Sequence, residues 1–294
     1  MTLKSNVDII NPGDNVIIGL GDSFTQGVGA YSDETYKKIK KLNPSLHNIT
    51  GQYFVEEQGK NNWVRQLVTN FLPEYKTMSL GVNGAGNRAA VKELYLNPLP
   101  DDVGNVVVIL MATGTERFDF LKNEKETAGP ENHQKWRTIW PTMNRDRGDI
   151  WKLEEQYATL VWSKKTDVME LLLNIAEAQQ FCKSKGYHFM FGPAFDDRIN
   201  KEYIENALEE DVHDWINVVN WNSYICPDSC TDFMQYIRNL ENHPEVTGFW
   251  QTQQYVSKLQ SPLKYITPCH HWTKEGAYEV SKVIYEILKS RNVV

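Results

Sequence analysis

The run Asn105 to Met111 (NVVVILM) constrains the fold of this chain more than any other segment. It is too short for an ordinary helix, and nearly every residue in it is apolar. A strand of that kind must be covered on both of its faces, as in a parallel sheet with helices packed on each side. The segment therefore predicts a buried strand in an α/β fold.

Other short apolar runs alternate with helical patterns along the chain. The further expected strands are short and bounded by turn residues: Asn15 to Leu20, Tyr75 to Leu80 and Tyr187 to Phe191. Leu263 to Ile266 is expected to be a short final strand or an extended segment. The expected helices have apolar residues at helical spacing: from Asn62 onward, Ala89 to Leu96, Trp151 to Lys185 with a break near Ser163, and Thr273 to Lys289. This alternation predicts a central parallel sheet with helices on both faces.

No linker-like stretch divides the 294 residues. We interpret residues 1–294 as one domain with two sizeable insertions, at about 31–61 and 119–150. The first is polar and irregular, with room for one short helix. The second is irregular and rich in charge and Trp, and its aromatic residues either pack it onto the core or form a platform for a sugar or acyl group.

Charge and hydropathy exclude several classes of function. A net charge of -7 argues against a nucleic-acid partner, which usually requires a basic surface. No apolar run reaches the roughly 18 residues of a membrane span, and the N-terminus lacks the apolar core of a signal peptide. The cytoplasm is the default location, with a viral or other particle assembly as the alternative. Four Cys in a chain of this length do not indicate a disulfide framework.

The triplet Gly21-Asp22-Ser23 directly follows the first expected strand and leads toward a helix. A Ser at this position has its hydroxyl exposed at the carboxyl edge of the sheet, where backbone N–H groups can face a developing oxyanion. The alternative is an Asp-Ser turn that only caps the helix. The triplet alone does not decide between a nucleophile and a cap.

Four segments together resemble the GDSL, or SGNH, hydrolase family. They follow the expected strands or precede the last helix: Gly21 to Ser23, SLGVNGAGN with Gly84, ATGTERF with Gly114, and HWTKEG from His271 to Gly276. The resemblance implies a flavodoxin-like three-layer α/β/α fold. It also implies the activity of an esterase, a lipase or a carbohydrate deacetylase.

The resemblance also assigns roles. Ser23 is the expected nucleophile and His271 the expected base, since an unassisted hydroxyl is a poor nucleophile. The backbone N–H groups of Ser23 and Gly84 and the side chain of Thr115 form the expected oxyanion hole. The candidate supporting residues are Asp22, Gly114, Glu116 and His270. No metal or organic cofactor is required.

Three of the family's side chains are replaced here. Thr115 and Glu116 stand where the family has Asn and Asp, and Pro268 replaces the Asp three residues before the base. Because that Asp normally orients the His, three alternatives remain. In order of preference, they are a backbone carbonyl near Pro268 that leaves a Ser-His dyad, a carboxylate from another segment, or a site that only binds. The candidate carboxylates are Glu116, Asp119 and Asp196.

Three further features remain open. His270 is an adjacent competitor for the role of base. Arg117 could pair with Glu116 or meet an anionic group of the substrate, and the ion pair is the favoured interpretation. Three thiols and His270 could form a zinc site, although buried free thiols are favoured over it. The three thiols are Cys226, Cys230 and Cys269.

The sequence thus favours a serine hydrolase that removes a small acyl or O-acetyl group from a carbohydrate or lipid. The acyl group would pass through Ser23, with His271 as base. The alternative is a weakly active or inactive module on the same fold that binds a ligand or has a structural role. The expected partner is a small-molecule or carbohydrate ester, and the oligomeric state is not predicted.

Overall fold

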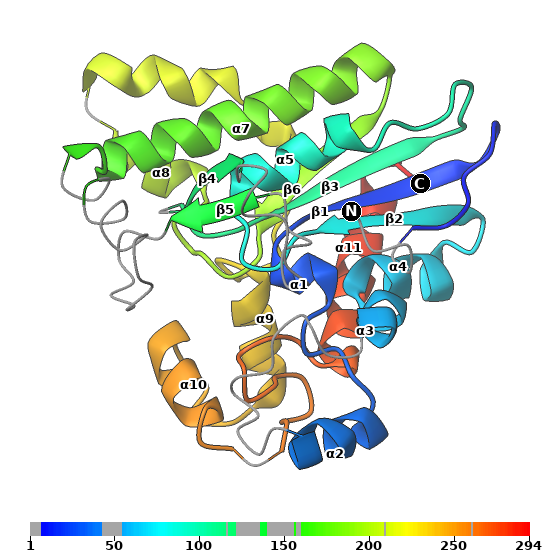
Figure 1. The fold of residues 1–294 in the computed structure, drawn as a ribbon. Coiled ribbons are helices and arrows are strands. Elements are labelled where there is room, and N and C mark those ends of the chain that lie inside the picture. Colours follow the sequence, from blue (N-terminus) through cyan, green and yellow to red (C-terminus); the bar gives the residue numbers. More distant parts are fainter. Residues whose placement is uncertain are drawn as a thin grey trace.

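A four-stranded parallel sheet forms the centre of the molecule (Figure 1). The computed structural model describes residues 7–42, 55–115, 117–121, 136–139, 156, 160–208, 210–259 and 261–294. The sheet has the order β2-β1-β3-β6, with the strands β1 (Asn15–Gly21), β2 (Tyr75–Gly81), β3 (Val106–Ala112) and β6 (His188–Pro193). All three strand pairs are parallel. This order matches the flavodoxin-like winding, so the predicted fold class is confirmed.

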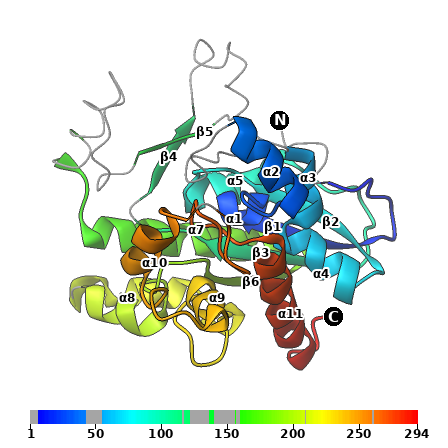
Figure 2. The same ribbon diagram turned by 90° about the horizontal axis from the view of Figure 1, so that it is seen from below.

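Helices cover both faces of the sheet, as Figures 1 and 2 show. Successive side chains of a strand point to opposite faces. Ile18 therefore packs toward α5 and α7, and Ile17 packs toward α4 and α11. These helices are α4 (Trp63–Phe71), α5 (Asn87–Leu96), α7 (Lys164–Lys185) and α11 (Lys274–Ser290). Each fully buried aliphatic side chain contributes about 1.5–3 kcal/mol, so these two layers form the main core.

The helix ends follow the capping residues in the sequence. Asn62, Ser163 and Thr273 each accept a hydrogen bond from a backbone N–H in the first turn of α4, α7 and α11. The predicted break near Ser163 is therefore the start of α7. Gly186 ends that helix in the left-handed conformation.

Both insertions contain more regular structure than the sequence predicts. The first contains two helices, α2 (Asp33–Leu42) and α3 (Val55–Asn61), instead of one. In the second, β4 (Phe118–Leu121) and β5 (Trp136–Ile139) form an antiparallel pair. Four-residue strands are too short to show a period in the sequence, which explains why they were missed. Most of the second insertion lies outside the described residues.

The prediction of a strand or an extended segment at Leu263 to Ile266 is wrong. The N–H of Leu263 donates to the carbonyl of Ile266 at 2.9 Å, and Ile266 forms only an isolated bridge with Trp272. The segment is a compact loop that leads into α11. The other elements of the C-terminal half are α8 (Lys201–Ala207), η4 (Glu210–Val218), η5 (Trp221–Ser223), α9 (Phe233–Glu241) and α10 (Phe249–Val256). Among the described residues, no helix combines the length and apolar character needed to cross a membrane.

Candidate active site

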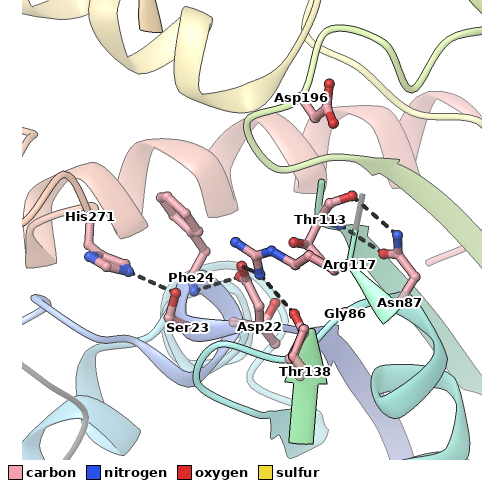
Figure 3. A network of polar contacts seen from close by, with 12 residues as sticks. Asp22, Ser23, Phe24, Gly86, Asn87, Thr113, Arg117, Thr138, Asp196 and His271 are labelled. Atoms are coloured by element: carbon pink, nitrogen blue, oxygen red, sulfur yellow. Dashed lines mark hydrogen bonds and ion pairs between the residues drawn. The ribbon is translucent and has the colours of Figure 1, made fainter. Parts of the chain in front are cut away.

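The polar residues that the sequence singles out gather beyond the carboxyl ends of β1, β2 and β3 (Figure 3). Ser23 begins the short helix α1 (Ser23–Gln26) directly after β1, and Asp22 caps that helix by accepting from the N–H of Phe24 at 3.0 Å. His271 comes from the loop before α11. Parallel α/β sheets commonly place their sites at this edge.

Ser23 and His271 are in direct contact. Ser23 Oγ lies 2.7 Å from His271 Nε2, and His271 Nδ1 lies 2.9 Å from the carbonyl oxygen of Cys269. A carbonyl can only accept, so Nδ1 carries the hydrogen and Nε2 is left to accept the proton of the Ser23 hydroxyl. The ring is thus held by a backbone carbonyl next to Pro268, the first of the three alternatives above.

The thiol of Cys269 also influences His271. Burial disfavours the charged imidazole, but negative charge at Cys269 and at Asp22 outweighs it, and the pKa of His271 is raised. Burial opposes a thiolate at Cys269, yet contact with His271 lowers the pKa of this Cys. Thr267 Oγ1 lies 3.1 Å from Cys269 Sγ and accepts from the N–H of His271 at 2.9 Å.

His270 does not compete for the role of base. Its backbone is in the left-handed region, with a φ of 63°, and its side chain is buried. Burial and the positive charges of His271 and Arg238 lower the pKa of His270 to about 3. His270 is therefore a neutral core residue, whereas its neighbour His271 contacts Ser23.

The expected oxyanion donors lie at this edge, and their role stays a prediction. The N–H groups of Ser23 and Gly84 have no acceptor within the part of the chain that the structure describes. Gly84 has a φ of 73°, a conformation that residues with a Cβ adopt at a cost. The N–H of Thr115 donates to Asp196 at 3.2 Å, which leaves only the Thr115 hydroxyl as a candidate donor. Gly114 lies between β3 and Thr115.

The two described carboxylates proposed to orient His271 have other partners. Asp196 pairs with Arg198 at 2.7 Å and accepts from Thr115. Asp119 accepts from the N–H groups of Gly86 and Ala89, each at 2.9 Å, at the start of α5. Neither Asp196 nor Asp119 therefore orients His271, and the alternative of an orienting carboxylate is wrong for both residues. Glu116 lies outside the described residues.

Arg117 makes contacts that sequence reasoning missed. Its Nη1 donates at 2.8 Å to Asp22 Oδ2 and at 2.8 Å to the carbonyl of Ala85. The expected partner, Glu116, lies outside the described residues, and the carboxylate that Arg117 contacts is Asp22, which lies 95 residues away in the sequence. No local pattern signals a pair at that separation.

Aromatic rings surround the Ser23 turn. The ring of Phe24 lies 4.8 Å from His271, 4.8 Å from Trp272 and 5.1 Å from Phe195, measured between centroids. The guanidinium carbon of Arg117 lies 5.3 Å from the centroid of Phe195. These rings give the site an apolar wall, which strengthens the electrostatic interactions beside it.

The proposed zinc ligands do not come together. Among the described residues, no three His, Cys, Asp or Glu side chains form a group that could hold a metal ion. Cys226, Cys230 and Cys269 are free thiols, and Cys269 packs against Tyr31 and Tyr36 of the first insertion.

Comparisons with known proteins add little to this geometry. The sequence matches no protein-family model, and a search of the curated proteins also finds no match. Among solved structures, an acetyl xylan esterase aligns with 93% of this chain and 99% of its own. It shares 12% identity, with a TM-score of 0.38.

Proposed function

We propose that this protein is a serine hydrolase that cleaves an ester through an acyl-enzyme on Ser23, with His271 as general base. The observation that carries the proposal is the pair of contacts of His271, whose Nε2 faces the Ser23 hydroxyl while Nδ1 is held by a carbonyl. A nucleophile, a base and an orienting group in line are the elements that acyl transfer needs.

In the first half of the reaction, Ser23 Oγ bonds to the ester carbon as its proton moves to His271 Nε2. The N–H groups of Ser23 and Gly84, with the hydroxyl of Thr115, stabilise the negative charge on the carbonyl oxygen. The bond to the leaving alcohol then breaks, and the alcohol takes the proton from Nε2. Water repeats these steps on the acyl-enzyme, releasing the acid and restoring Ser23.

A carbonyl in place of a carboxylate weakens the dyad but does not abolish it. A neutral hydrogen bond contributes about 0.5–1.5 kcal/mol and one to a charged group about 1.5–3, so the difference is roughly tenfold in rate. The carbonyl of Cys269 still selects the productive tautomer of His271. In serine proteases, most of the cost of a neutral partner comes from the wrong tautomer.

The proposed substrate is an ester of a small acyl group, such as an O-acetyl group on a carbohydrate or lipid. This class comes from the resemblance to SGNH hydrolases at the four segments. Phe24 and Phe195 support it, since their apolar rings beside Ser23 suit the non-reacting part of such an ester.

Turnover of p-nitrophenyl acetate tests the proposal. We expect Ser23→Ala and His271→Ala each to lose at least about 10²-fold in kcat/KM relative to the wild type. If all three proteins match the rate in buffer, the second candidate gains: an SGNH-like module that binds but does not hydrolyse. The lack of a described carboxylate on His271 is the observation that favours this second candidate.

A further inference from the structure

Two loops must keep a fixed separation for the proposed reaction. One is the turn that carries Ser23, and the other is the loop 82–86 after β2, which carries Gly84. The N–H of Val82 donates to the carbonyl of Gly21 at 3.0 Å, which joins the first residue of this loop to the end of β1. This bond is made by Val82, two residues before Gly84, so the N–H of Gly84 needs a further anchor.

The side chain of Arg117 supplies that anchor. Its Nη1 reaches Asp22, the residue before Ser23, and also the carbonyl of Ala85, the residue after Gly84. Figure 3 shows the guanidinium extending from the β3 side of the site to the Asp22–Ser23 turn. The side chains are 11% exposed for Arg117 and 1% exposed for Asp22, so water competes little with this pair.

The geometry points to Arg117 as a positioning residue that clamps the nucleophile turn to the loop of the oxyanion donor. This inference rests on the proposed function and adds a residue to it. Arg117 acts through Asp22 and Ala85, setting the distance between the Ser23 hydroxyl and the N–H of Gly84.

The segment that carries Arg117 also contacts the loop 82–86 at a second point, through Asp119. Arg117 and Asp119 are two residues apart, so in an extended chain their side chains share a face. Asp119 holds the N–H groups of Gly86 and Ala89. A Cβ on Gly86 would lie 2.7 Å from Asp119 Oδ2 and 2.9 Å from Arg117 Cβ, so only Gly allows this approach.

Both bonds of the clamp come from a single nitrogen, so different replacements of Arg117 should have different effects. The ammonium of Lys can in principle donate to both acceptors, whereas Met has a similar length and no donor. We therefore expect Lys at position 117 to retain much of the function and Met to lose it. Asp22→Asn keeps an oxygen for the cap on Phe24 but removes the charge that Arg117 meets.

The test compares Arg117→Met, Arg117→Lys and Asp22→Asn with the control Arg65→Met. Arg65 also pairs with an aspartate, Asp8, but that pair lies beside β2 and away from Ser23. We expect Arg117→Met to lose about 10²-fold in kcat with little change in KM, as for a displaced catalytic group. Arg117→Lys should stay within about tenfold of the wild type, and Arg65→Met within about twofold.

The double variant Arg117→Met/Asp22→Asn sharpens the test. If Arg117 acts through Asp22, the double variant should lose little more than the worse single variant. Fully additive losses would contradict the clamp. So would an Arg117→Met enzyme with wild-type kcat, or an Arg65→Met enzyme that loses as much as Arg117→Met. Should Arg117→Met not fold, Asp22→Asn takes its place, and wild-type kcat in that variant would contradict the clamp.

Hydrogen exchange separates a failure of the clamp from a failure of the proposed function. Peptides that cover residues 21–26 and 82–86 should exchange faster in Arg117→Met than in the wild type, but not in Arg65→Met. If the wild type neither hydrolyses esters nor reacts with a fluorophosphonate, the proposed function fails, and exchange alone decides on the clamp. Unchanged exchange in both peptides would overturn the clamp whatever the activity.

Discussion

Two arginine–aspartate pairs in this protein have the same chemistry but different surroundings. Arg117 and Asp22 meet beyond the carboxyl ends of the strands, and Arg65 and Asp8 meet beside the edge strand β2. Arg65 Nη1 lies 2.7 and 2.9 Å from the two oxygens of Asp8, and Asp8 also accepts from the N–H of Thr77. The first pair joins loops of the site, whereas the second joins an N-terminal segment to β2 and α4.

The two pairs differ in burial, which sets how much each contributes to stability. The Arg65 and Asp8 side chains are 22% and 27% exposed, so water screens their attraction, and such pairs contribute about 0–1 kcal/mol. Asp22 is almost completely buried. Removing one partner of a buried pair costs about 3–5 kcal/mol, because the other charge is left uncompensated.

The largest effect on stability apart from the pairs is expected at Asp119, which anchors the same loop as Arg117. Asp119→Ala removes acceptors for Gly86, Ala89 and the hydroxyl of Thr138. At about 1 kcal/mol or more for each hydrogen bond, the free energy of unfolding should fall by at least about 3 kcal/mol, together with kcat. Urea denaturation and ester turnover measure both. Unchanged kcat in a folded variant would break the link between this loop and the site.

The next effect is the loss of stability in acid that His270 is expected to cause. His270 has a pKa of about 3 when folded and the ordinary value near 6.5 when unfolded. Its stabilising effect is therefore complete above pH 6.5 and is lost as the pH falls toward 3, because only the unfolded chain takes up the proton. Between pH 7 and pH 4, the free energy of unfolding of His270→Gln should rise by about 3 kcal/mol relative to that of the wild type, as measured by denaturation at each pH. A constant difference would show that His270 titrates normally.

A smaller effect is expected at the outer pair. Arg65→Met should lower the free energy of unfolding by about 1 kcal/mol and leave kcat and KM unchanged. Thermal melting and ester kinetics provide the two measurements. A large fall in kcat without unfolding would mean that the outer pair also governs the site, and the contrast between the two pairs would fail.

The smallest effect concerns the pH profile. Only neutral His271 can accept the proton of Ser23, so the rate should rise with pH through the pKa of His271. Burial lowers this pKa, but negative charge at Cys269 raises it above the ordinary value. Cys269→Ala keeps the carbonyl and removes the thiol, so the rise should move to lower pH. A shift to higher pH would contradict the assignment.

The parts predicted from the sequence depend on local patterns. The four sheet strands are short apolar runs, and the caps Asn62 and Thr273 are polar residues directly before a helical period. Ser23 and His271 were singled out because each lies in a short motif of fixed spacing. Such features depend on neighbours within a few residues, which a single sequence displays.

The parts that were not predicted depend on contacts between distant segments or on the backbone. The carbonyl that holds His271 belongs to Cys269, and any residue has a carbonyl, so residue type gives no signal for it. The partner of Arg117 is 95 residues away. The left-handed backbone of His270, which helps to set apart two adjacent His residues, is likewise not a property of residue type.

The most direct test of the proposed nucleophile is covalent labelling with a fluorophosphonate, followed by mass analysis of the peptide that contains Ser23. We predict one adduct, located on Ser23 and absent from Ser23→Ala. Its formation should be slowed in His271→Ala and unchanged in Arg65→Met. No adduct on the wild type, or an equal adduct on Ser23→Ala, would contradict the assignment of Ser23 as the nucleophile.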